Sequence, residues 1–216
     1  MNTRLANNTN LSLHNRSTWN NRPVLQQKGG LIINYLERIE QVAQLALAEY
    51  PRTFVARVDL RLPDHYEDSS AVSRFIQSLK AQIHADQQYR RRVEKRSHCC
   101  RLRYVWARER NQAHQDHYHL LLFFNSDAYN CLGRYDSCNM NLAMRIQKAW
   151  ASALSLDFQS ACNLVHFPRN PGYQLNTASP TFNQAYQAMF ERSSYLAKAH
   201  TKHYGSGLNS FGSSRG

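Results

Sequence analysis

The chain has 216 residues, 42% of them hydrophobic, which is enough for one sizeable core, so we expect one domain with appendages. Its formal net charge of +12 and pI of about 9.8 favour a polyanionic partner such as nucleic acid. No run approaches the roughly 20 apolar residues of a membrane span, and no apolar signal core is present. We therefore expect a cytoplasmic protein without a membrane partner, and five reduced cysteines.

The first half of the chain alternates between helical and extended patterns. Residues 1–28 are rich in Asn, Ser, Thr and Gln and are expected to be disordered or loosely packed. Apolar residues at helical spacing predict an N-terminal helix within 29–50. Residues 53–62 alternate between apolar and charged side chains, which predicts a half-buried strand. A helix is predicted over 69–85, followed by a basic exposed loop or helix end at 89–96.

The second half continues with two strands, at 101–109 and 117–125, joined by a polar loop that fits a hairpin. Residues 139–154 have the spacing of a helix. A short fourth strand is predicted over 163–167, and the segment 171–180 is predicted to be a loop.

A last helix is predicted over 181–203, and a flexible Gly/Ser-rich tail over 205–216. Residues 51–204 therefore form the main domain, in the order β-α-β-β-α-β plus the last helix. This order predicts an α+β fold with an antiparallel sheet, of the ferredoxin-like or RNA-recognition-module-like kind. We expect helices on one face of the sheet and an open opposite face.

Alternation along the strands gathers the charged residues on the open face, because residues two apart in a strand point to the same side. The predicted set consists of Arg57, Asp59, Arg61, Arg103, Glu109, His117 and His119.

The histidine pair on this face has the spacing of a metal site. His117 and His119 project side by side from one strand, and Glu109 lies eight residues before His117 across the hairpin loop. Two imidazoles and a carboxylate suit Mn²⁺ or Mg²⁺, with positions left for phosphate oxygens. Zinc fits the histidines too, so the identity of the metal stays open. The alternative for Glu109 is a salt bridge with an arginine at the strand end.

Tyr195 is the candidate nucleophile. At helical spacing it lies opposite the apolar side of the last helix, together with Lys198 and Lys202. A phenol is a poor nucleophile until a neighbouring positive charge favours its anion, and Lys198 and a metal-bound phosphate would supply that charge. The alternative is a solvent-facing tyrosine beside ordinary surface lysines.

These residues together predict transesterification of DNA. Tyr195 attacks a phosphodiester and leaves a 5′-phosphotyrosine and a free 3′-hydroxyl. The expected partner is single-stranded DNA or an origin hairpin, with no small-molecule cofactor. The residues expected to contact DNA are Arg57, Asp59, Arg61, Arg103 and Lys202. The main alternative is a non-catalytic DNA-binding regulator, such as a repressor or an origin-binding protein, that uses the same fold. An RNA-recognition module would carry aromatic residues on the open face, which this chain lacks.

The His117-Tyr118-His119 motif resembles the His-hydrophobe-His signature of HUH endonucleases, the rolling-circle replication initiators and relaxases. The Tyr195-x-x-Lys198 motif resembles their tyrosine motif, and Glu109 matches the third metal ligand of initiators from small single-stranded DNA viruses. Initiators with paired tyrosines carry a second one a turn later, where this chain has Ala199. The resemblance therefore implies a single-tyrosine enzyme, with Tyr204 as the next candidate.

Residues 50–205 as a whole resemble the YagK/YfjJ C-terminal domain family, found in prophages and filamentous phages. The matching segments are 57–63, 103–109, 117–125, 149–154 and 194–198. This resemblance implies a replication-initiator-type nicking enzyme in the cytoplasm of a bacterial host, with a host helicase or polymerase as further partners. A structural protein of the phage particle is not favoured by the charged open face.

Overall fold

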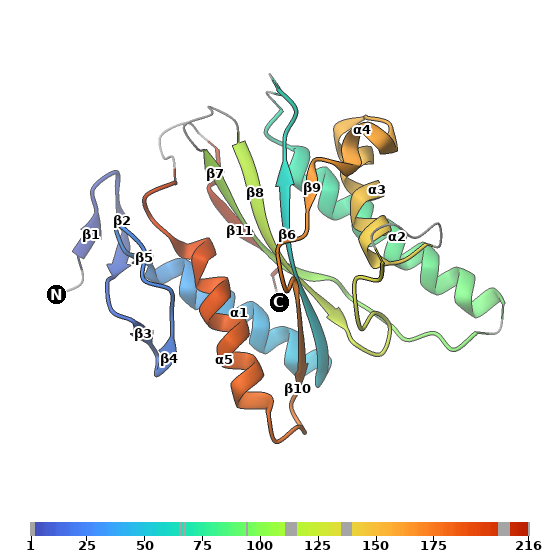
Figure 1. The fold of residues 1–216 in the computed structure, drawn as a ribbon, viewed down its shortest axis with the longest axis horizontal. Helices are drawn as coiled ribbons and strands as arrows, with labels where there is room; N and C mark the ends of the chain where they lie inside the picture. Colours follow the sequence, from blue (N-terminus) through green and yellow to red (C-terminus); the bar gives the residue numbers. More distant parts are fainter. Residues whose placement is uncertain are drawn as a thin grey trace.

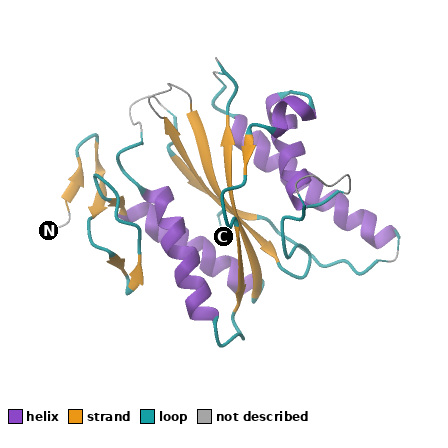
Figure 2. Cartoon of the chain, in the orientation of Figure 1, coloured by secondary structure: helices purple, strands orange, loops and turns teal. Residues whose placement is uncertain are grey.

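The structure is a computed structural model that describes residues 3–64, 66, 68–93, 95–110, 116–134, 140–202 and 208–215. It is a mixed α+β protein built on one large antiparallel sheet (Figure 1, Figure 2). The strand order of this sheet is β10-β6-β8-β7-β11, and β9 also pairs with β6. None of the described helices is long and apolar enough to cross a lipid bilayer.

Three long strands form the centre of the sheet: β6 (Arg52–Arg61), β7 (Arg103–Arg110) and β8 (Asp116–Asn125). The central strand, β8, pairs antiparallel with both neighbours along nearly its whole length. Its apolar residues are continuous, as expected for a strand buried on both faces. The sheet is extended at its edges by β9 (Val165–His166), β10 (Gly172–Asn176) and β11 (Phe211–Ser213).

One face of the sheet packs against α2 (Ala71–Arg92) and α3 (Leu142–Leu154), followed by the short α4 (Phe158–Cys162) (Figure 1). Trp150 of α3 is fully buried there, and its indole N–H donates a hydrogen bond to a strand carbonyl at 3.0 Å. Burying a large apolar side chain contributes roughly 1.5–3 kcal/mol, so the buried apolar residues of α2 and α3 hold both helices on the sheet.

The opposite face of the sheet is not open, and the expectation of a free face was wrong. The helices α1 (Ile33–Glu49) and α5 (Phe182–Ser193) cover part of it (Figure 1). They pack on Val55, Val105 and Leu121, which share this face with the charged residues. The face is therefore apolar at one end, where the helices cover it, and charged at the other end.

The first residues of the chain form short strands where loose packing was expected. These are β1 (Thr3–Leu5), β2 (Asn8–His14), β3 (Thr18–Trp19), β4 (Arg22–Pro23) and β5 (Leu31–Ile32). Backbone pairing needs few apolar side chains, and Trp19 anchors the segment by stacking on Phe190 with ring centroids 5.7 Å apart. Val24 is buried in the same core, and the polar composition of the segment concealed both apolar contacts.

Two segments expected to be irregular add strands to the sheet. In the predicted loop, β10 pairs with β6; a Cβ on Gly172 would lie only 2.7 Å from the Phe54 ring, so glycine here permits a close approach. In the predicted flexible tail, β11 pairs with β7, and Phe211 stacks on Tyr35 with centroids 4.0 Å apart.

Two helix boundaries also differ from the prediction. The helix α2 continues to Arg92, so much of the basic segment is helical. The last helix, α5, ends at Ser193 and is followed by a 3₁₀ turn, η1 (Ser194–Ala197), which contains Tyr195. The helical spacing that was used to place Tyr195 beside Lys198 and Lys202 therefore does not apply, because Tyr195 lies in the 3₁₀ turn and Lys198 follows it.

The close contact between Gly212 and Trp106 tests whether the tail strand contributes to stability. A Cβ at position 212 would lie 2.5 Å from the Trp106 ring, which is itself packed edge-on against Tyr118. We expect Gly212→Ala to cost about 1–3 kcal/mol, which lowers the melting temperature by roughly 2–10 °C in thermal denaturation. The control is Asn209→Ala at an exposed position of the same segment. Equal melting temperatures for the two variants would show that β11 is dispensable.

Candidate functional site

The pairing of the three central strands assembles the site at the charged end of the sheet. His119 lies opposite Asp59 of β6, and His117 lies between Arg61 of β6 and Glu109 of β7. Opposed residues in a sheet have their Cβ atoms about 5 Å apart, so these side chains meet on one face.

The two histidines and the glutamate form a compact group. One ligand atom from each of Glu109, His117 and His119 lies within 4.8 Å of the others. The Glu109 Oε2 atom is 3.3 Å from His119 Nε2 and 3.8 Å from His117 Nε2. Both histidines therefore turn the same ring nitrogen toward one carboxylate oxygen.

The orientation of His119 is set from behind by Asp59. The His119 Nδ1 atom lies 2.6 Å from Asp59 Oδ1, which also accepts a hydrogen bond from Arg57 at 3.0 Å. Burial alone would raise the pKa of Asp59, but the hydrogen bond from His119 and the Arg57 charge hold it well below its usual range. In the tautomer whose Nδ1–H donates to this carboxylate, Nε2 presents its lone pair to the site.

These residues fit a divalent cation. The His119 Nε2 atom is buried and has no hydrogen-bond partner among the described residues, although it faces a carboxylate oxygen. Burial and the neighbouring His119 lower the pKa of His117, which favours the neutral imidazole that metals bind. Nitrogen lone pairs and a carboxylate oxygen converge on one point, and a cation there would satisfy all three.

Two lysines hold the same carboxylate from the other side. Lys198 Nζ lies 2.6 Å from Glu109 Oε2, and Lys202 Nζ lies 2.7 Å from Oε1. Burial raises the pKa of Glu109, but the close contact with His119 and the charges of Lys202 and Lys198 outweigh it and keep the pKa far below the ordinary value. Burial lowers the pKa of Lys202 to about 8, against the opposing effect of Glu109. Glu109 is thus a fully buried carboxylate that is paired with two ammonium groups and faces Nε2 of His119.

Tyr195 reaches the site from η1. The buried Leu196 and Ala197 anchor this turn in the core shared by α1 and α5. The Tyr195 ring packs edge-on against His119, with centroids 5.3 Å apart, and Lys198 Nζ donates a hydrogen bond to the Tyr195 hydroxyl. The phenol therefore lies beside both the histidine group and an ammonium.

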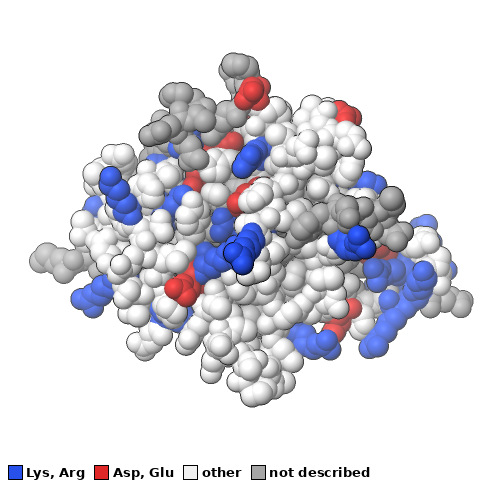
Figure 3. Space-filling model, viewed as in Figure 1, with Lys and Arg blue, Asp and Glu red and all other residues white. Residues whose placement is uncertain are grey.

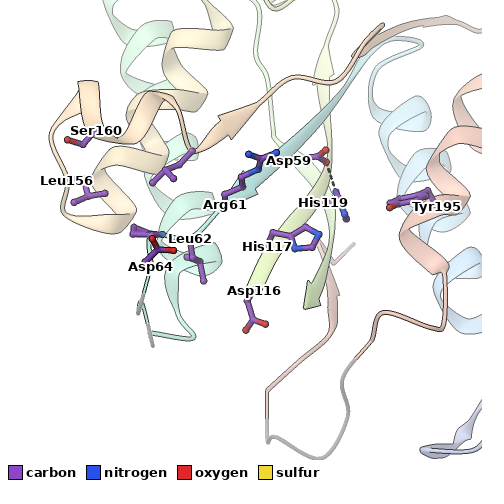
Figure 4. A pocket seen from close by; sticks show the side chains of 12 residues that line it. Asp59, Arg61, Leu62, Asp64, Asp116, His117, His119, Leu156, Ser160 and Tyr195 are labelled. Carbon is purple, nitrogen blue, oxygen red and sulfur yellow. Dashed lines mark hydrogen bonds and ion pairs between the residues drawn. The ribbon is translucent and has the colours of Figure 1, made fainter. Parts of the chain in front are cut away.

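An open cleft of about 790 Å³ gives access to these groups. His117, His119 and Tyr195 line one side of it. Figure 4 shows Ser160 of α4 and Asp64 across the cleft from Tyr195, with the contact between Asp59 and His119 marked. Tyr195 is therefore accessible from this cleft.

Most of the residues expected to contact DNA have other partners. Arg57 and Lys202 are buried and bind Asp59 and Glu109. Arg103 is not brought to the site at all; it pairs with Glu49 at 2.9 Å near the other end of the sheet. Of the predicted DNA contacts, Arg61 is exposed and lines the cleft. Tyr204 lies outside the described residues.

The sequence pattern did not reveal the role of Asp59 behind His119. The contact depends on strand register, since Asp59 and His119 are 60 positions apart. His166 also approaches Asp59, with 3.6 Å between Nδ1 and Oδ2. In the sequence, the one indication of this contact was that Asp59 lies on the charged face of its predicted strand, the face that also carries His119.

The comparison with known proteins gives the family. The model of the YagK/YfjJ C-terminal domain matches residues 14–214. The chain belongs to this family. YagK of Escherichia coli (strain K12) is 37% identical over 195 residues, which cover 85% of this chain and 93% of YagK. YfjJ of the same strain is 38% identical over 201 residues, covering 87% and 97%. Both relatives are described as uncharacterized, and no solved structure matches.

Metal binding by this member of the family should depend on Asp59. Because Asp59 orients His119 without reaching the cation, we expect Asp59→Ala to weaken Mn²⁺ binding about 10–100-fold in isothermal titration calorimetry. The matched control is Asp64→Ala, which removes a carboxylate from the same cleft. Similar losses in the two variants would mean that the general charge of the cleft, and not the orientation of His119, controls binding.

Proposed function

We propose that this protein is a metal-dependent single-strand DNA endonuclease of the HUH type, of the kind that initiates rolling-circle replication. It nicks and rejoins DNA through a 5′-phosphotyrosine on Tyr195. The observation that supports this proposal most strongly is that the Lys198 ammonium contacts both the Tyr195 hydroxyl and the Glu109 carboxylate. It links the candidate nucleophile to the candidate metal ligands.

The topology supports the proposal. The helix α2 connects β6 to β7, α3 follows β8, and β9 and β10 return to the edge beside β6. This arrangement fits a ferredoxin-like β-α-β-β-α-β core. The histidines lie on its central strand, and the tyrosine comes from the segment after it, as in HUH endonucleases.

The reaction would proceed by in-line displacement at phosphorus. The Tyr195 oxygen forms a bond to the scissile phosphorus as its proton leaves to water, and the bond from phosphorus to the 3′ oxygen breaks. That oxygen takes up a proton and becomes a free 3′-hydroxyl, while the 5′-phosphate stays on Tyr195. Attack by a 3′-hydroxyl reverses these steps and rejoins the strand.

The side chains around Tyr195 prepare it for this attack. The Lys198 ammonium lies beside the phenolic oxygen, and the Arg57 guanidinium carbon is 5.3 Å from the ring centroid. Positive charge placed in advance around a reacting anion is an effective way to stabilise a transition state. His117, His119 and Glu109 would hold Mn²⁺ or Mg²⁺, which supplies further positive charge to the phosphate.

The nucleophile is tested by Tyr195→Phe with labelled single-stranded DNA from the element that encodes the protein. We expect the covalent protein–DNA adduct to disappear on a denaturing gel, because the variant lacks the attacking oxygen, while DNA binding stays within about twofold. Tyr173→Phe, on β10 away from the cleft, is the matched control and should form the adduct normally.

Other outcomes separate the alternatives. An adduct that survives in Tyr195→Phe would contradict the assignment and make Tyr204 the next candidate. Tight, salt-sensitive DNA binding by the unaltered protein, without cleavage across several origin-like sequences and metals, would indicate the non-catalytic regulator instead.

A further inference from the structure

We propose that the C-terminal end of α2 forms a second nucleic-acid site, which binds a single-stranded DNA segment flanking the one that enters the cleft. This inference builds on the DNA-cleaving function proposed above. We call the site the α2 basic surface and define it by five exposed residues: Tyr89, Arg91, Arg92, Lys95 and Arg96.

Within the part of the chain that the structure describes, the charges of this surface have no acidic partners. Among the described residues, no acidic side chain forms an ion pair with Arg91, Arg92, Lys95 or Arg96. Figure 3 shows positive side chains gathered at the lower right of the molecule, where Figure 1 places the end of α2. Unpaired, exposed cations in one place attract a polyanion and release its counterions on binding.

Helix stability alone does not explain this composition. Cations in the last turn of a helix interact favourably with its dipole, typically by about 0.3–1 kcal/mol, and this accounts for Arg91 and Arg92. Lys95 and Arg96 lie beyond the helix end, where the favourable interaction with the dipole falls off. Tyr89 carries no charge, so its exposure needs a separate reason.

Tyr89 supplies the second observation. Its side chain is 58% exposed, the largest exposed fraction among the exposed large hydrophobic residues that the structure describes. It borders a concavity of about 540 Å³, which Arg90, Lys95 and the exposed Met140 also line. An exposed aromatic ring among cations is the arrangement that binds single strands, where each stacked base contributes about 1–3 kcal/mol.

The wall of the concavity is held in place by Asp86. This largely buried carboxylate pairs with Arg90 at 3.0 Å and with Arg145 at 2.6 Å, and it accepts a hydrogen bond from the Tyr129 hydroxyl at 2.7 Å. The pairing joins α2 to α3 and neutralises the one described acidic group in the concavity. The wall of the concavity beside Tyr89 and Lys95 is therefore preorganised, which reduces the entropy lost on binding there.

The α2 basic surface is distinct from the cleft. His117 lies near the start of β8, whereas Asn125 ends that strand and binds the segment after α2 through the Cys99 carbonyl at 2.8 Å. Eight residues of strand correspond to about 26 Å. Because His117 and Asn125 lie at opposite ends of β8, single-stranded DNA that reaches both sites would place several nucleotides between the nick and the α2 basic surface.

The charge contribution is tested by a triple variant, Arg91→Gln/Arg92→Gln/Lys95→Gln, in fluorescence anisotropy with single-stranded DNA of about 30 nucleotides. We expect affinity at low salt to fall about tenfold or more, and the slope of log K against log salt to decrease by about 2. The matched control, Arg4→Gln/Arg16→Gln/Lys28→Gln, removes the same charge from exposed positions elsewhere. Equal losses in the two triple variants would overturn the proposal.

The stacking contribution is tested by two substitutions of one residue. Tyr89→Ala should weaken binding about fivefold or more, whereas Tyr89→Phe, which keeps the ring, should bind as the unaltered protein does. Equal affinity for Tyr89→Ala and the unaltered protein would show that the Tyr89 ring does not contribute to DNA binding.

Two further measurements separate this inference from its alternatives. If the α2 triple variant lost binding to phosphatidylglycerol vesicles but kept its DNA affinity, the surface would be a membrane contact and the proposal would fail. If the unaltered protein cleaved no DNA but the α2 triple variant still bound DNA more weakly than the control, the proposed cleavage would be rejected. DNA binding by the α2 basic surface would still be supported. The full-length chain is used throughout.

Discussion

The buried carboxylate of Glu109 is the interaction on which the site depends. Removing a charge from water is costly, and an unpaired buried carboxylate would destabilise the fold by several kcal/mol. Here the charge is balanced by Lys198 and Lys202, which both follow η1 in the chain. The same ion pairs connect β7 to the segment that carries Tyr195, so the contacts that stabilise the Glu109 charge also fix the position of Tyr195.

The two faces of the sheet differ in composition: one is largely apolar, and the other is apolar at one end and charged at the other end. Strand alternation sends large apolar residues toward α2 and α3 along the full length of β6 and β8. On the other face, α1 and α5 cover only the apolar end, and polar residues occupy the rest. The charged end can be polar because each buried charge has a specific partner, as with Asp59 and Arg57. A rigid apolar layer thus supports a preorganised polar one.

The positive charge of the chain serves two purposes that composition cannot separate. Arg57, Lys198 and Lys202 are buried and neutralise carboxylates within the site. The cations of the α2 basic surface, Arg91, Arg92, Lys95 and Arg96, are exposed and without described acidic partners. Only the second group is available to a large polyanion at the surface, while the first group acts on whatever enters the cleft. Net charge alone therefore overstates how much of the surface can attract DNA.

The sequence by itself determined the three central strands, their apolar and charged faces, and the placement of His117, His119 and Glu109 on one of those faces, because a period of two is a local property of the chain. It did not reveal that α1 and α5 cover part of that face, or that β10 and β11 extend the sheet, since both depend on contacts between distant segments. Register, which is a tertiary property, decided that Asp59 meets His119 and that Arg103 lies far from the site. The tertiary structure likewise placed Lys198 and Lys202, which follow the 3₁₀ turn after α5, against Glu109. A buried carboxylate requires such neutralising partners, and no local sequence pattern shows which residues they are.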